Sequence, residues 1–446
     1  MAGKWPYKRV EEIALKIAMG PFGSSIKVET FTDSGIPIIS GQHLREAQVT
    51  DGEFNFITEA HADSLKNANV QRGDVIFTHA GNIGQVAFIP DGSAYQRYVI
   101  SQRQFYLRCN TDLMLPEFIT YYFKTPEGQH RLLANANQVG VPSIARPSSY
   151  LKTIEVPAPS IEEQLVVVRN IKALDAKIRL NIGINQTLEA MAQAIFKSWF
   201  VDFDPVKTKI AAKREGRDPL RAAMTTISGK PDAELDALLP EQYAQLAATA
   251  ALFPDEMEES ELGDIPRGWS VSKVETLLSR LSAKARYTKE QVSAYGQIPV
   301  FEQGASILLG YHNGVASYPA SAESPMFIFG DHTCVTRLSF QPFDISQNVI
   351  PLQGKDRATA WVYYAVKEKQ KFQEYRRHWM ELISKDVVIA TADICLEFSK
   401  RITKLHLQIE ANERQMQSLR ELRDTLLPKL LSGELSVTEA AAEAEA

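Results

Sequence analysis

Residue types that commonly carry catalysis are scattered along this chain of 446 residues. The eight histidines form no His-Glu-x-x-His metal motif, and no Gly-x-Ser-x-Gly nucleophile elbow occurs. Asp204-Pro205 is followed by Val206, so it is not the Asn/Asp-Pro-Pro-Tyr/Phe motif of an amino-methyltransferase. Pro-Asp pairs at Pro231 and Pro254 lack a downstream Glu-x-Lys on a plausible strand, which a nuclease centre needs. A catalytic serine triad assembled from distant segments is not excluded by the sequence. The lack of the other catalytic motifs favours a binding function over catalysis.

Two polar segments combine glycine with side chains that can form hydrogen bonds. They are Gly20-Pro-Phe-Gly-Ser-Ser and His79-Ala-Gly-Asn-Ile-Gly. Neither fits the phosphate-binding patterns Gly-x-x-x-x-Gly-Lys-Ser/Thr or Gly-x-Gly-x-x-Gly after a strand. Each is either a tight turn that merely requires glycine or an exposed recognition loop. The sequence leaves both interpretations open.

Composition indicates an ordinary globular chain of two or three domains, with 44% hydrophobic and 23% charged residues. No apolar run approaches the length of a membrane span, and the N-terminus lacks the apolar core of a signal peptide. Three dispersed cysteines, Cys109, Cys334 and Cys395, argue against a disulfide framework or a cysteine-rich metal site. We therefore expect a reducing, cytoplasmic location and no metal.

The net charge of −5 alone disfavours a nucleic-acid partner, but the distribution of charge along the chain does not. Residues 206–265 hold 7 basic and 12 acidic residues. Residues 1–160 are balanced at 15 and 15, and residues 266–392 hold 15 basic and 11 acidic residues. A mildly basic second block permits a DNA-binding face without establishing one.

An apolar heptad pattern occurs twice, separated by 231 residues. Its seam positions alternate at spacings of three and four, which is typical of a coiled coil. The seam consists of Ile171, Leu174, Ile178, Asn181, Leu188 and Ile195, and of Ile402, Leu405, Ile409, Asn412, Leu419 and Leu426. The pattern predicts long helices over 162–199 and 395–431. Such a repeat indicates a chain built from two similar halves.

Local signals delimit these helices. Ser160 and Glu163 have the spacing of a capping box at the start of the first helix. Gly183 should weaken that helix by about 1 kcal/mol relative to alanine. Gly433 is a natural stop signal for the second. The first helix, about 35 residues at ~1.5 Å each, would be roughly 50 Å long and needs a partner helix for its apolar stripe.

Before each long helix lies a block of short β-prone runs. In the first block the runs are Ile36–Ser40, Val75–Thr78, Val86–Ile89 and Gln104–Leu107, with a helix near Glu117–Lys124. The second block repeats several anchors in the same order. They are Trp5, Val10 and Glu11 with Trp269, Val274 and Glu275; Ile36-Pro37 with Ile298-Pro299; Ile100-Ser-Gln102 with Ile345-Ser-Gln347; and Tyr121-Tyr122 with Tyr363-Tyr364. Strong divergence between anchors suggests one scaffold carrying two different recognition surfaces.

Residues 206–265 differ from both blocks, because they are rich in alanine, proline and charge. A possible amphipathic helix covers Asp232–Leu252. We expect a variable connector packed loosely on the surface.

The order of elements and several strings resemble the specificity (S) subunit of type I restriction-modification systems, over almost the whole chain. The strings are Gly20-Pro-Phe-Gly-Ser with Lys27, Pro157-x-Pro with Glu163-Gln164, Trp199-Phe-Val-Asp-Phe-Asp-Pro, Leu252-Phe-Pro-Asp with Ser260-Glu-Leu-Gly-Asp-Ile-Pro-Arg-Gly-Trp, and Leu426-Leu-Pro-Lys-Leu-Leu-Ser-Gly. The second helix lacks the Pro-x-Pro and Glu-Glu-Gln entry of the first, which puts an identical entry geometry in doubt.

The resemblance implies an α+β fold with a pseudo-two-fold internal repeat. Two β-rich target-recognition domains, 1–160 and 266–392, would be held apart by two long antiparallel coiled-coil helices within 161–205 and 393–435. An acidic connector, 206–265, and a frayed tail, 436–446, complete the chain. The helix length would act as a ruler, with at most about 15 base pairs between half-sites at ~3.4 Å each.

The resemblance also implies a non-catalytic partner for double-stranded DNA. Two modification subunits would dock on the chain and methylate adenine at N6, and restriction subunits would complete an ATP-dependent nuclease. S-adenosylmethionine, ATP and magnesium would bind those partners and not this chain. No membrane is involved.

DNA-binding candidates are polar residues expected on loops, where donors and acceptors can reach a groove. In the first domain they are Ser24, Ser25, Lys27, Gln42, His43, Thr78, His79, Asn82, Arg97, Gln102 and Arg103. In the second they are Gln303, Tyr311, His312, Asn313, Asp331, His332, Thr333, Arg337, Gln347 and Asn348. Each could also be an ordinary solvated side chain, and the recurring Gln102 and Gln347 could support the fold instead. Basic members would contact phosphates rather than bases.

Asn181 and Asn412 occupy matching seam positions, where a buried asparagine can fix the register of a coiled coil. We expect them to lie near each other across the helix pair, or else to face solvent. Two rival functions stay open: a coiled-coil scaffold without DNA contact, and a stand-alone DNA-binding protein without a methyltransferase partner.

Overall fold

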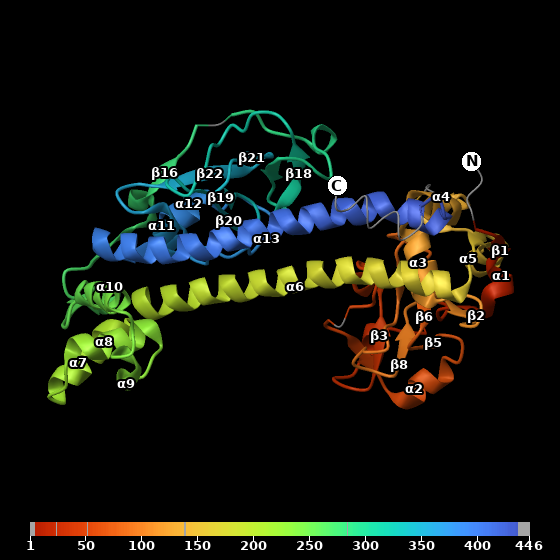
Figure 1. Ribbon diagram of the computed structural model, residues 1–446, viewed down its shortest axis with the longest axis horizontal. Helices are drawn as coiled ribbons and strands as arrows, with labels where there is room; N and C mark the ends of the chain where they lie inside the picture. Colours follow the sequence, from red (N-terminus) through yellow and green to blue (C-terminus); the bar gives the residue numbers. More distant parts are fainter. Residues whose placement is uncertain (1–4, 24, 51, 138–139, 283, 436–446) are drawn as a thin grey trace. The chain divides into compact units, whose positions relative to one another are not determined.

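The computed structural model describes residues 5–23, 25–50, 52–137, 140–282 and 284–435. Its contacts divide the chain into two compact units. The first unit comprises Met1–Ile178 with Ser418–Ala446, and the second comprises Arg179–Gln417. The two long helices, α6 (Ile161–Phe200) and α13 (Ala392–Ser432), therefore contribute residues to both units (Figure 1). The frayed tail predicted for 436–446 lies outside the described residues.

The first unit contains two four-stranded sheets. One is antiparallel, in the order β2-β9-β6-β7, and the other has the order β4-β3-β8-β5 with β3 parallel to β8. The strands of the unit are β1 (Tyr7–Arg9), β2 (Ala14–Met19), β3 (Ile36–Ile39), β4 (Asn55–Ile57), β5 (Asn69–Gln71), β6 (Asp74–Thr78), β7 (Val86–Phe88), β8 (Arg97–Ile100), β9 (Gln104–Cys109), β10 (Ala136–Asn137), β11 (Ser143–Ile144) and β12 (Glu155–Pro157). The helices are α1 (Val10–Ile13), α2 (Glu59–Ser64), α3 (Pro116–Lys124), α4 (Pro126–Leu133) and α5 (Pro147–Thr153), with 3-10 turns η1 (Val28–Thr30) and η2 (Gly41–Leu44).

The second unit repeats this topology. An antiparallel sheet has the order β16-β22-β19-β20, and a smaller sheet, β18-β17-β21, pairs β17 parallel to β21. The strands are β13 (Met257–Ser260), β14 (Gly263–Pro266), β15 (Ser270–Lys273), β16 (Leu278–Arg280), β17 (Ile298–Phe301), β18 (Leu308–His312), β19 (Met326–Gly330), β20 (Thr336–Ser339), β21 (Asp344–Ile345), β22 (Val349–Gly354) and β23 (Asp386–Ile389). Helices α11 (Thr359–Val366) and α12 (Trp379–Ile383), and 3-10 turns η3 (Val274–Leu277) and η4 (Lys289–Gln291), complete the block.

The anchors that recur in the sequence fall at equivalent places in the two topologies. Ile36 and Ile298 begin β3 and β17, and Ile100 and Ile345 end the strands parallel to them. The tyrosine pairs need a shift of one residue, because Tyr121 and Tyr364 are each the sixth residue of their helices, α3 and α11. The repeat is therefore a repeat of the scaffold, with loops of different length and composition.

Helix α6 begins with the predicted capping box. The Ser160 backbone N–H donates to Glu163 Oε2 at 3.0 Å, and the Glu163 N–H donates to Ser160 Oγ at 3.3 Å. Gly183 lies within the continuous helix, and Gly433 follows the end of α13 with a φ of +73°. A left-handed residue of this kind is the usual way to end a helix. The helix boundaries predicted from the sequence agree with the structure to within a few residues.

The seam residues of both helices are buried or half-buried. In the first unit Ile171 shares a core with Leu426 and with the sheet residues Phe77 and Phe105. In the second unit Ile402 shares a core with Trp199 and Trp361. Each β-rich block is thus anchored on a segment of α6 and a segment of α13, because the apolar stripe of each helix needs cover from water.

Asn181 and Asn412 are buried in the second unit, with 1% and 6% of their surface exposed. They are not bonded to each other. Asn181 Nδ2 donates to Gln415 Oε1 at 2.7 Å, and Asn412 Nδ2 donates to Asn185 Oδ1 at 2.7 Å. Gln408 Nε2 donates to Asn412 Oδ1 at 2.8 Å. The seam therefore holds amide pairs between α6 and α13, which specify one register because a slip would strand buried polar groups.

In each unit a tyrosine ties a helix of the β-rich block, α3 or α11, to the long helices. The Tyr121 hydroxyl donates to Asp175 Oδ2 at 2.8 Å, and Arg423 Nη1 donates to Asp175 Oδ1 at 2.8 Å. In the second unit the Tyr364 hydroxyl lies 2.8 Å from His406 Nε2, the residue 231 positions after Asp175. Burial lowers the pKa of His406 to about 4, so this imidazole is neutral at pH 7.

The expectation of a loosely packed connector is wrong. Residues 204–251 form α7 (Asp204–Arg214), α8 (Pro219–Ser228), α9 (Asp232–Leu235) and α10 (Pro240–Ala251). These helices bury a small core of Ala223, Met224, Leu235, Leu246 and Ala250. The single helix predicted over Asp232–Leu252 is also wrong, because Pro240 has no backbone N–H to continue a helix and instead begins α10. Within the described ranges no helix is both long and apolar enough to cross a bilayer.

Replacing Asn412 with leucine should lower the free energy of unfolding by about 1–3 kcal/mol, because it leaves the half-buried Asn185 oxygen and the Gln408 amide without their partner. Urea denaturation of the full chain measures the change. Replacing exposed Gln186, also on α6, with leucine is the control and should change it little. Unchanged stability in the Asn412 variant would contradict the amide-pair assignment.

Acid should destabilise the second unit through His406. Its folded pKa of about 4 lies below the ordinary unfolded value of about 6.5, so the unfolded state takes up the proton first. The contribution is complete above pH 6.5 and is lost as pH falls towards 4, up to about 3 kcal/mol. His406→Gln should flatten the stability profile across this window, measured by urea denaturation at a series of pH values. The same change at exposed His130 should leave the slope unaltered.

Candidate nucleic-acid interface

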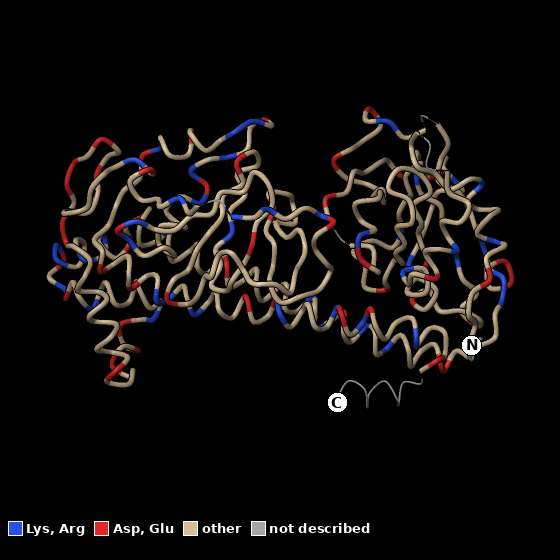
Figure 2. Tube along the Cα trace, turned by 90° about the horizontal axis from the view of Figure 1, so that it is seen from above, with Lys and Arg blue, Asp and Glu red and all other residues tan. Residues whose placement is uncertain are grey.

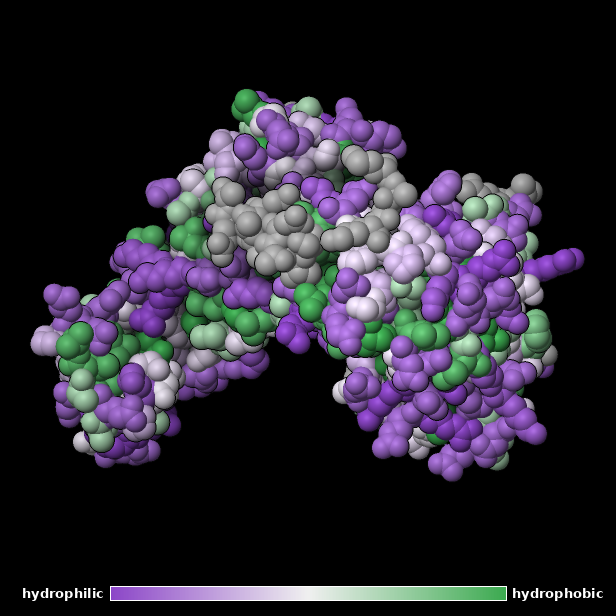
Figure 3. Space-filling view, turned by 45° about the vertical axis from the view of Figure 1, so that its right-hand side comes forward, coloured by the Kyte–Doolittle hydropathy of each residue, from purple (hydrophilic) through white to green (hydrophobic). Residues whose placement is uncertain are grey.

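A polar hollow of about 350 Å³ lies in the first unit where the ends of its two sheets meet. Its walls come from the residues after β3, from the β6–β7 turn and from the β8–β9 turn. The polar residues that line it are Ser40, Asn55, Thr78, Asn82, Gln85, Ser101, Gln102, Arg103 and Gln104. Thr78, Asn82, Gln102 and Arg103 belong to the set predicted from the sequence. The face of this unit seen in Figure 3 is mainly hydrophilic, with smaller apolar patches.

Buried amides form the floor of this hollow. Gln85 Nε2 donates to the Gly41 carbonyl at 2.9 Å, and the Thr78 hydroxyl donates to Gln85 Oε1 at 3.1 Å. Gln104 Nε2 donates to Thr78 Oγ1 at 3.4 Å. Thr78 is only 2% exposed, so it supports the two turns rather than facing a ligand. The sequence analysis missed Gln85 and Gln104, because single glutamines in β-prone runs carry no motif.

The rim of the hollow is formed by two turns held side by side. The His79 backbone N–H donates to the Arg103 carbonyl at 2.9 Å, and His79 Nε2 lies 3.2 Å from the Gln102 carbonyl. Gly81 and Gly84 adopt φ values of +82° and +87°, which other residues rarely adopt. The glycines of this segment are therefore required by the turn itself.

Asn82, Gln102 and Arg103 are exposed on this rim, and among the described residues their side chains have no hydrogen-bond partner. Among the described residues no hydrogen bond of the Gln102 side chain therefore supports the alternative that Gln102 stabilises the fold. Amide and guanidinium groups of this kind can form paired hydrogen bonds with base edges or phosphates. This rim is the strongest candidate interface of the first unit.

Other predicted residues of the first unit lie elsewhere. Ser24 lies outside the described residues, and Ser25, Lys27 and Gln42 are exposed but do not line the hollow. His43 is buried and stacks on Phe54 with ring centroids 4.4 Å apart, and burial lowers its pKa. Arg97 Nη2 is paired with Asp63 Oδ1 at 2.6 Å. The burial of His43 and the pairing of Arg97 give both side chains roles within the fold.

The second unit brings part of its predicted set together at the β19–β20 turn. Gln303 Oε1 accepts the His332 backbone N–H at 3.0 Å, and the Thr333 hydroxyl donates to the Gln303 carbonyl at 2.8 Å. The His332 ring packs on Tyr375, with centroids 4.8 Å apart. Asp331 Oδ1 accepts the Trp379 backbone N–H at 3.0 Å, so this carboxylate supports α12.

A second group surrounds the buried carboxylate of Asp344. His312 Nε2 lies 2.9 Å from Asp344 Oδ2, and its ring stacks on Tyr287 at 4.5 Å. The Gly314 N–H donates to His312 Nδ1, so the Nε2 nitrogen carries the proton towards Asp344. Tyr311 is half-buried and Asn313 is exposed near this group, where Asn313 Oδ1 accepts the Gln297 N–H at 3.0 Å.

The structure separates Arg337 from the other candidates. Its Nη2 donates to Glu413 Oε2 of α13 at 2.5 Å, and its side chain is 27% exposed. Gln347 and Asn348 are instead exposed on the β21–β22 turn, with Asn348 at a φ of +60°. Among the described residues the Gln347 side chain has no hydrogen-bond partner, as for Gln102.

Tyr375 and Arg377 are candidates that the sequence analysis missed. They lie next to the His332 turn and are strongly exposed, with 73% of Tyr375 and 80% of the Arg377 side chain accessible. The run Tyr375-Arg-Arg-His378 interleaves basic and aromatic residues, a signal of nucleic-acid contact. Figure 2 shows basic and acidic residues interspersed along both units, so any DNA contact depends on particular side chains rather than on a broad basic field.

Comparison with known proteins shows what these features resemble. Residues 3–190, less than half of the chain, match the family model described as "Type I restriction modification DNA specificity domain". The chain is thus similar to type I specificity proteins. Among its relatives is the type I restriction enzyme HindI specificity subunit of Haemophilus influenzae, 28% identical over 414 residues, covering 82% of this chain and 87% of that protein.

A second sequence relative is more distant. The MjaIX specificity subunit of Methanocaldococcus jannaschii is 22% identical, covering 98% of this chain and 94% of that protein. A solved type I S subunit from M. genitalium aligns over 96% of both chains with 14% identity and a TM-score of 0.49. The two sequence relatives span both units of this chain, whereas the family model leaves out residues 418–446 of the first unit and most of the second.

Replacing Gln85 with alanine should lower the free energy of unfolding by about 1–2 kcal/mol, because it leaves the Gly41 carbonyl and Thr78 without their partner. Thermal or urea denaturation measures the change. Alanine at exposed Gln102 is the matched control and should stay within about 0.5 kcal/mol of the parent. Equal effects of the two substitutions would contradict the assignment of Gln85 to the floor of the hollow and of Gln102 to its rim.

Proposed function

We propose that this chain is the DNA sequence-recognition subunit of a type I restriction-modification complex. It binds a bipartite, asymmetric target in double-stranded DNA, and it docks modification subunits that methylate adenine at N6 and restriction subunits. The chain itself is non-catalytic, and S-adenosylmethionine, ATP and magnesium bind the partner subunits. Similarity to the type I DNA specificity domain and to a type I specificity subunit supports this proposal.

One observation supports the proposal that the DNA target is bipartite. The β6–β7 and β8–β9 turns of the first unit correspond in topology to the β19–β20 and β21–β22 turns of the second. The first pair presents Asn82, Gln102 and Arg103, whereas the second presents His332, Gln347 and Asn348. One scaffold with different hydrogen-bonding groups at the same turns fits two half-sites of different sequence.

The long helices suit a spacer role. They contain 40 and 41 residues, or about 60 Å at 1.5 Å per residue. Because each helix contributes core residues to both units, we propose that it sets the number of base pairs left unread between the half-sites. A helix of this length corresponds to at most about 18 base pairs.

Methylome sequencing tests the proposal. Cells that express this chain with its neighbouring methyltransferase should carry a split motif, with two different half-sites and methylated adenine in each. A contiguous or palindromic motif would contradict the two-scaffold proposal. Absence of any methylation that depends on the chain would favour the scaffold alternative.

Arg103→Ala should weaken DNA binding at low salt and reduce the slope of log affinity against log salt by about 1, because a rim guanidinium of this kind contacts a phosphate. Fluorescence anisotropy with the methyltransferase-bound chain measures both quantities. Arg97→Ala is the matched control, since Arg97 is already paired with Asp63. The loss should be similar for cognate and mismatched DNA; a loss confined to cognate DNA would assign Arg103 to base recognition instead.

A further inference from the structure

Both units contain a pocket where a helix of the β-rich block meets the long helices, but in the described part of the chain only the second pairs its lysine with a carboxylate of the same unit. In the second unit the pocket has a volume of about 430 Å³, and Glu189 of α6 lies in its wall. The Tyr364 hydroxyl donates to Glu189 Oε2 at 3.1 Å, and Lys367 Nζ forms an ion pair with Glu189 Oε1. The lysine of this pocket is thus neutralised within the unit.

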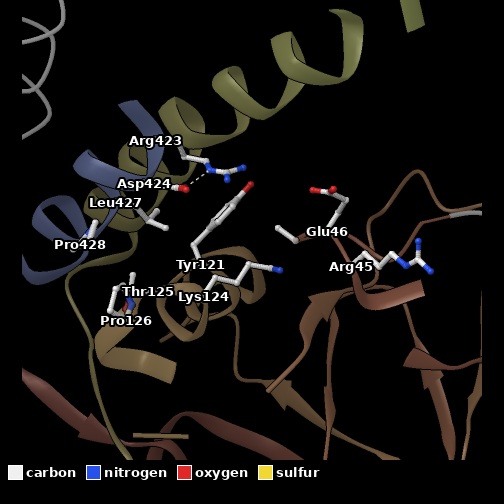
Figure 4. Close-up of a pocket in the computed structure, with 11 residues that line it drawn as sticks. Arg45, Glu46, Tyr121, Lys124, Thr125, Pro126, Arg423, Asp424, Leu427 and Pro428 are labelled. Carbon is white, nitrogen blue, oxygen red and sulfur yellow. Dashed lines mark hydrogen bonds and ion pairs between the residues drawn. The ribbon is translucent and has the colours of Figure 1, made fainter. Parts of the chain in front are cut away.

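The pocket of the first unit has a volume of about 390 Å³ and an equivalent tyrosine and lysine (Figure 4). Tyr121 and Lys124 are the sixth and ninth residues of α3, and Tyr364 and Lys367 occupy the sixth and ninth positions counted from the start of α11. The acid differs, because the residue 231 positions after Glu189 is Arg420. The first unit therefore lacks the carboxylate that pairs with the lysine in the second.

Among the described residues no acid of the first unit forms an ion pair with Lys124, although the charge of Glu46 acts on it and opposes the lowering of its pKa by burial. Asp175 is bonded to Tyr121 and Arg423, and Asp424 accepts from Arg423 Nε at 2.9 Å. Among the described residues Lys124 has no hydrogen bond or ion pair, although its side chain is half-buried. Figure 4 shows the Lys124 side chain extending into the space between Tyr121 and Glu46, which forms no ion pair of its own.

Desolvation reinforces the need for an anion. Burial lowers the pKa of Lys124, which means that the pocket is a poor environment for its unpaired charge. A partly buried ammonium gains most from a carboxylate that also forms hydrogen bonds. Leu427 and Pro428 form an apolar edge beside the charged groups, suited to the methylene groups of an acidic side chain.

We propose that the pocket lined by Lys124, Tyr121 and Arg423 binds a carboxylate group from outside the chain, in the place that Glu189 fills in the second unit. Two sources share this chemistry: an acidic side chain of a partner subunit and a free dicarboxylate. Only the first source depends on the proposed function.

NMR of the full chain labelled with ¹³C-lysine tests the pocket without partner or DNA. Sodium glutarate at constant ionic strength should shift the Lys124 signal, assigned by its loss in Lys124→Gln, and the shift should saturate. Absence of a saturable shift would overturn the proposal. An equal shift with inorganic phosphate at the same concentrations would overturn its restriction to carboxylates. Because DNA is absent, failure here leaves the proposed function untouched.

Variants give matched controls. Arg420→Glu restores the acid at the repeat position and should abolish the glutarate response while Lys124 is still present. Glu46→Gln removes the nearest competing acid and should tighten glutarate binding. Lys367→Gln, the equivalent change in the second unit, should leave the Lys124 response unaltered; a loss there would overturn the assignment of the site.

Assembly with the methyltransferase subunit distinguishes the two sources. If a partner side chain fills the pocket, Lys124→Gln should weaken assembly at least tenfold, and glutarate should compete with the partner. If assembly is unchanged and the glutarate response persists, the source is a free dicarboxylate. Circular dichroism of each variant verifies that the chain remains folded.

Discussion

The pairing of α6 with α13 is the constraint on which both units depend. Neither helix could keep its apolar stripe in water at this length, so each needs the other and a β-rich block as cover. In the first unit Ile171 and Leu426 join the core beneath the antiparallel sheet, and in the second Ile402 and Trp199 do the same. The side-chain hydrogen bonds of Asn181 and Asn412 then select one register for the helix pair. With the register fixed, Tyr121 of α3 lies opposite Asp175 of α6, and Tyr364 of α11 lies opposite His406 of α13.

Much of this architecture follows from the sequence, because periodicity and capping are local signals. The heptad seam, the Ser160 capping box and the Gly433 stop predict both long helices, and β-branched runs predict the main strands. Side-chain partners depend on tertiary contacts and are not encoded locally. For this reason the sequence predicts only that Asn181 and Asn412 lie near each other, and the structure supplies their hydrogen-bond partners, Gln415 and Asn185. The compact connector was missed because its core of alanine, methionine and leucine is small and follows no long period.

The candidate interface shows the same division. Exposed turn residues such as Asn82 and Gln102 could be proposed from polarity and glycine, since those signals mark turns. The interior positions of His43 and Thr78, and the ion pair of Arg337 with Glu413, could not, because burial of a polar residue depends on which loops pack over it. The roles of Gln85 and Tyr375 can be recognised only from the residues that they contact in the fold. Duplication of the scaffold helps here, because equivalent turns can be compared and the differing side chains identified.

The central claim is that two equivalent scaffolds recognise different half-sites, and exchange of one scaffold tests it most directly. Residues 5–157 would be replaced with the corresponding segment of a type I specificity subunit of known target, and the methylome of cells expressing the hybrid with its methyltransferase would be sequenced. The account predicts that one half of the split motif changes while the other half and the gap stay the same. A change in both halves, or in neither, would contradict it.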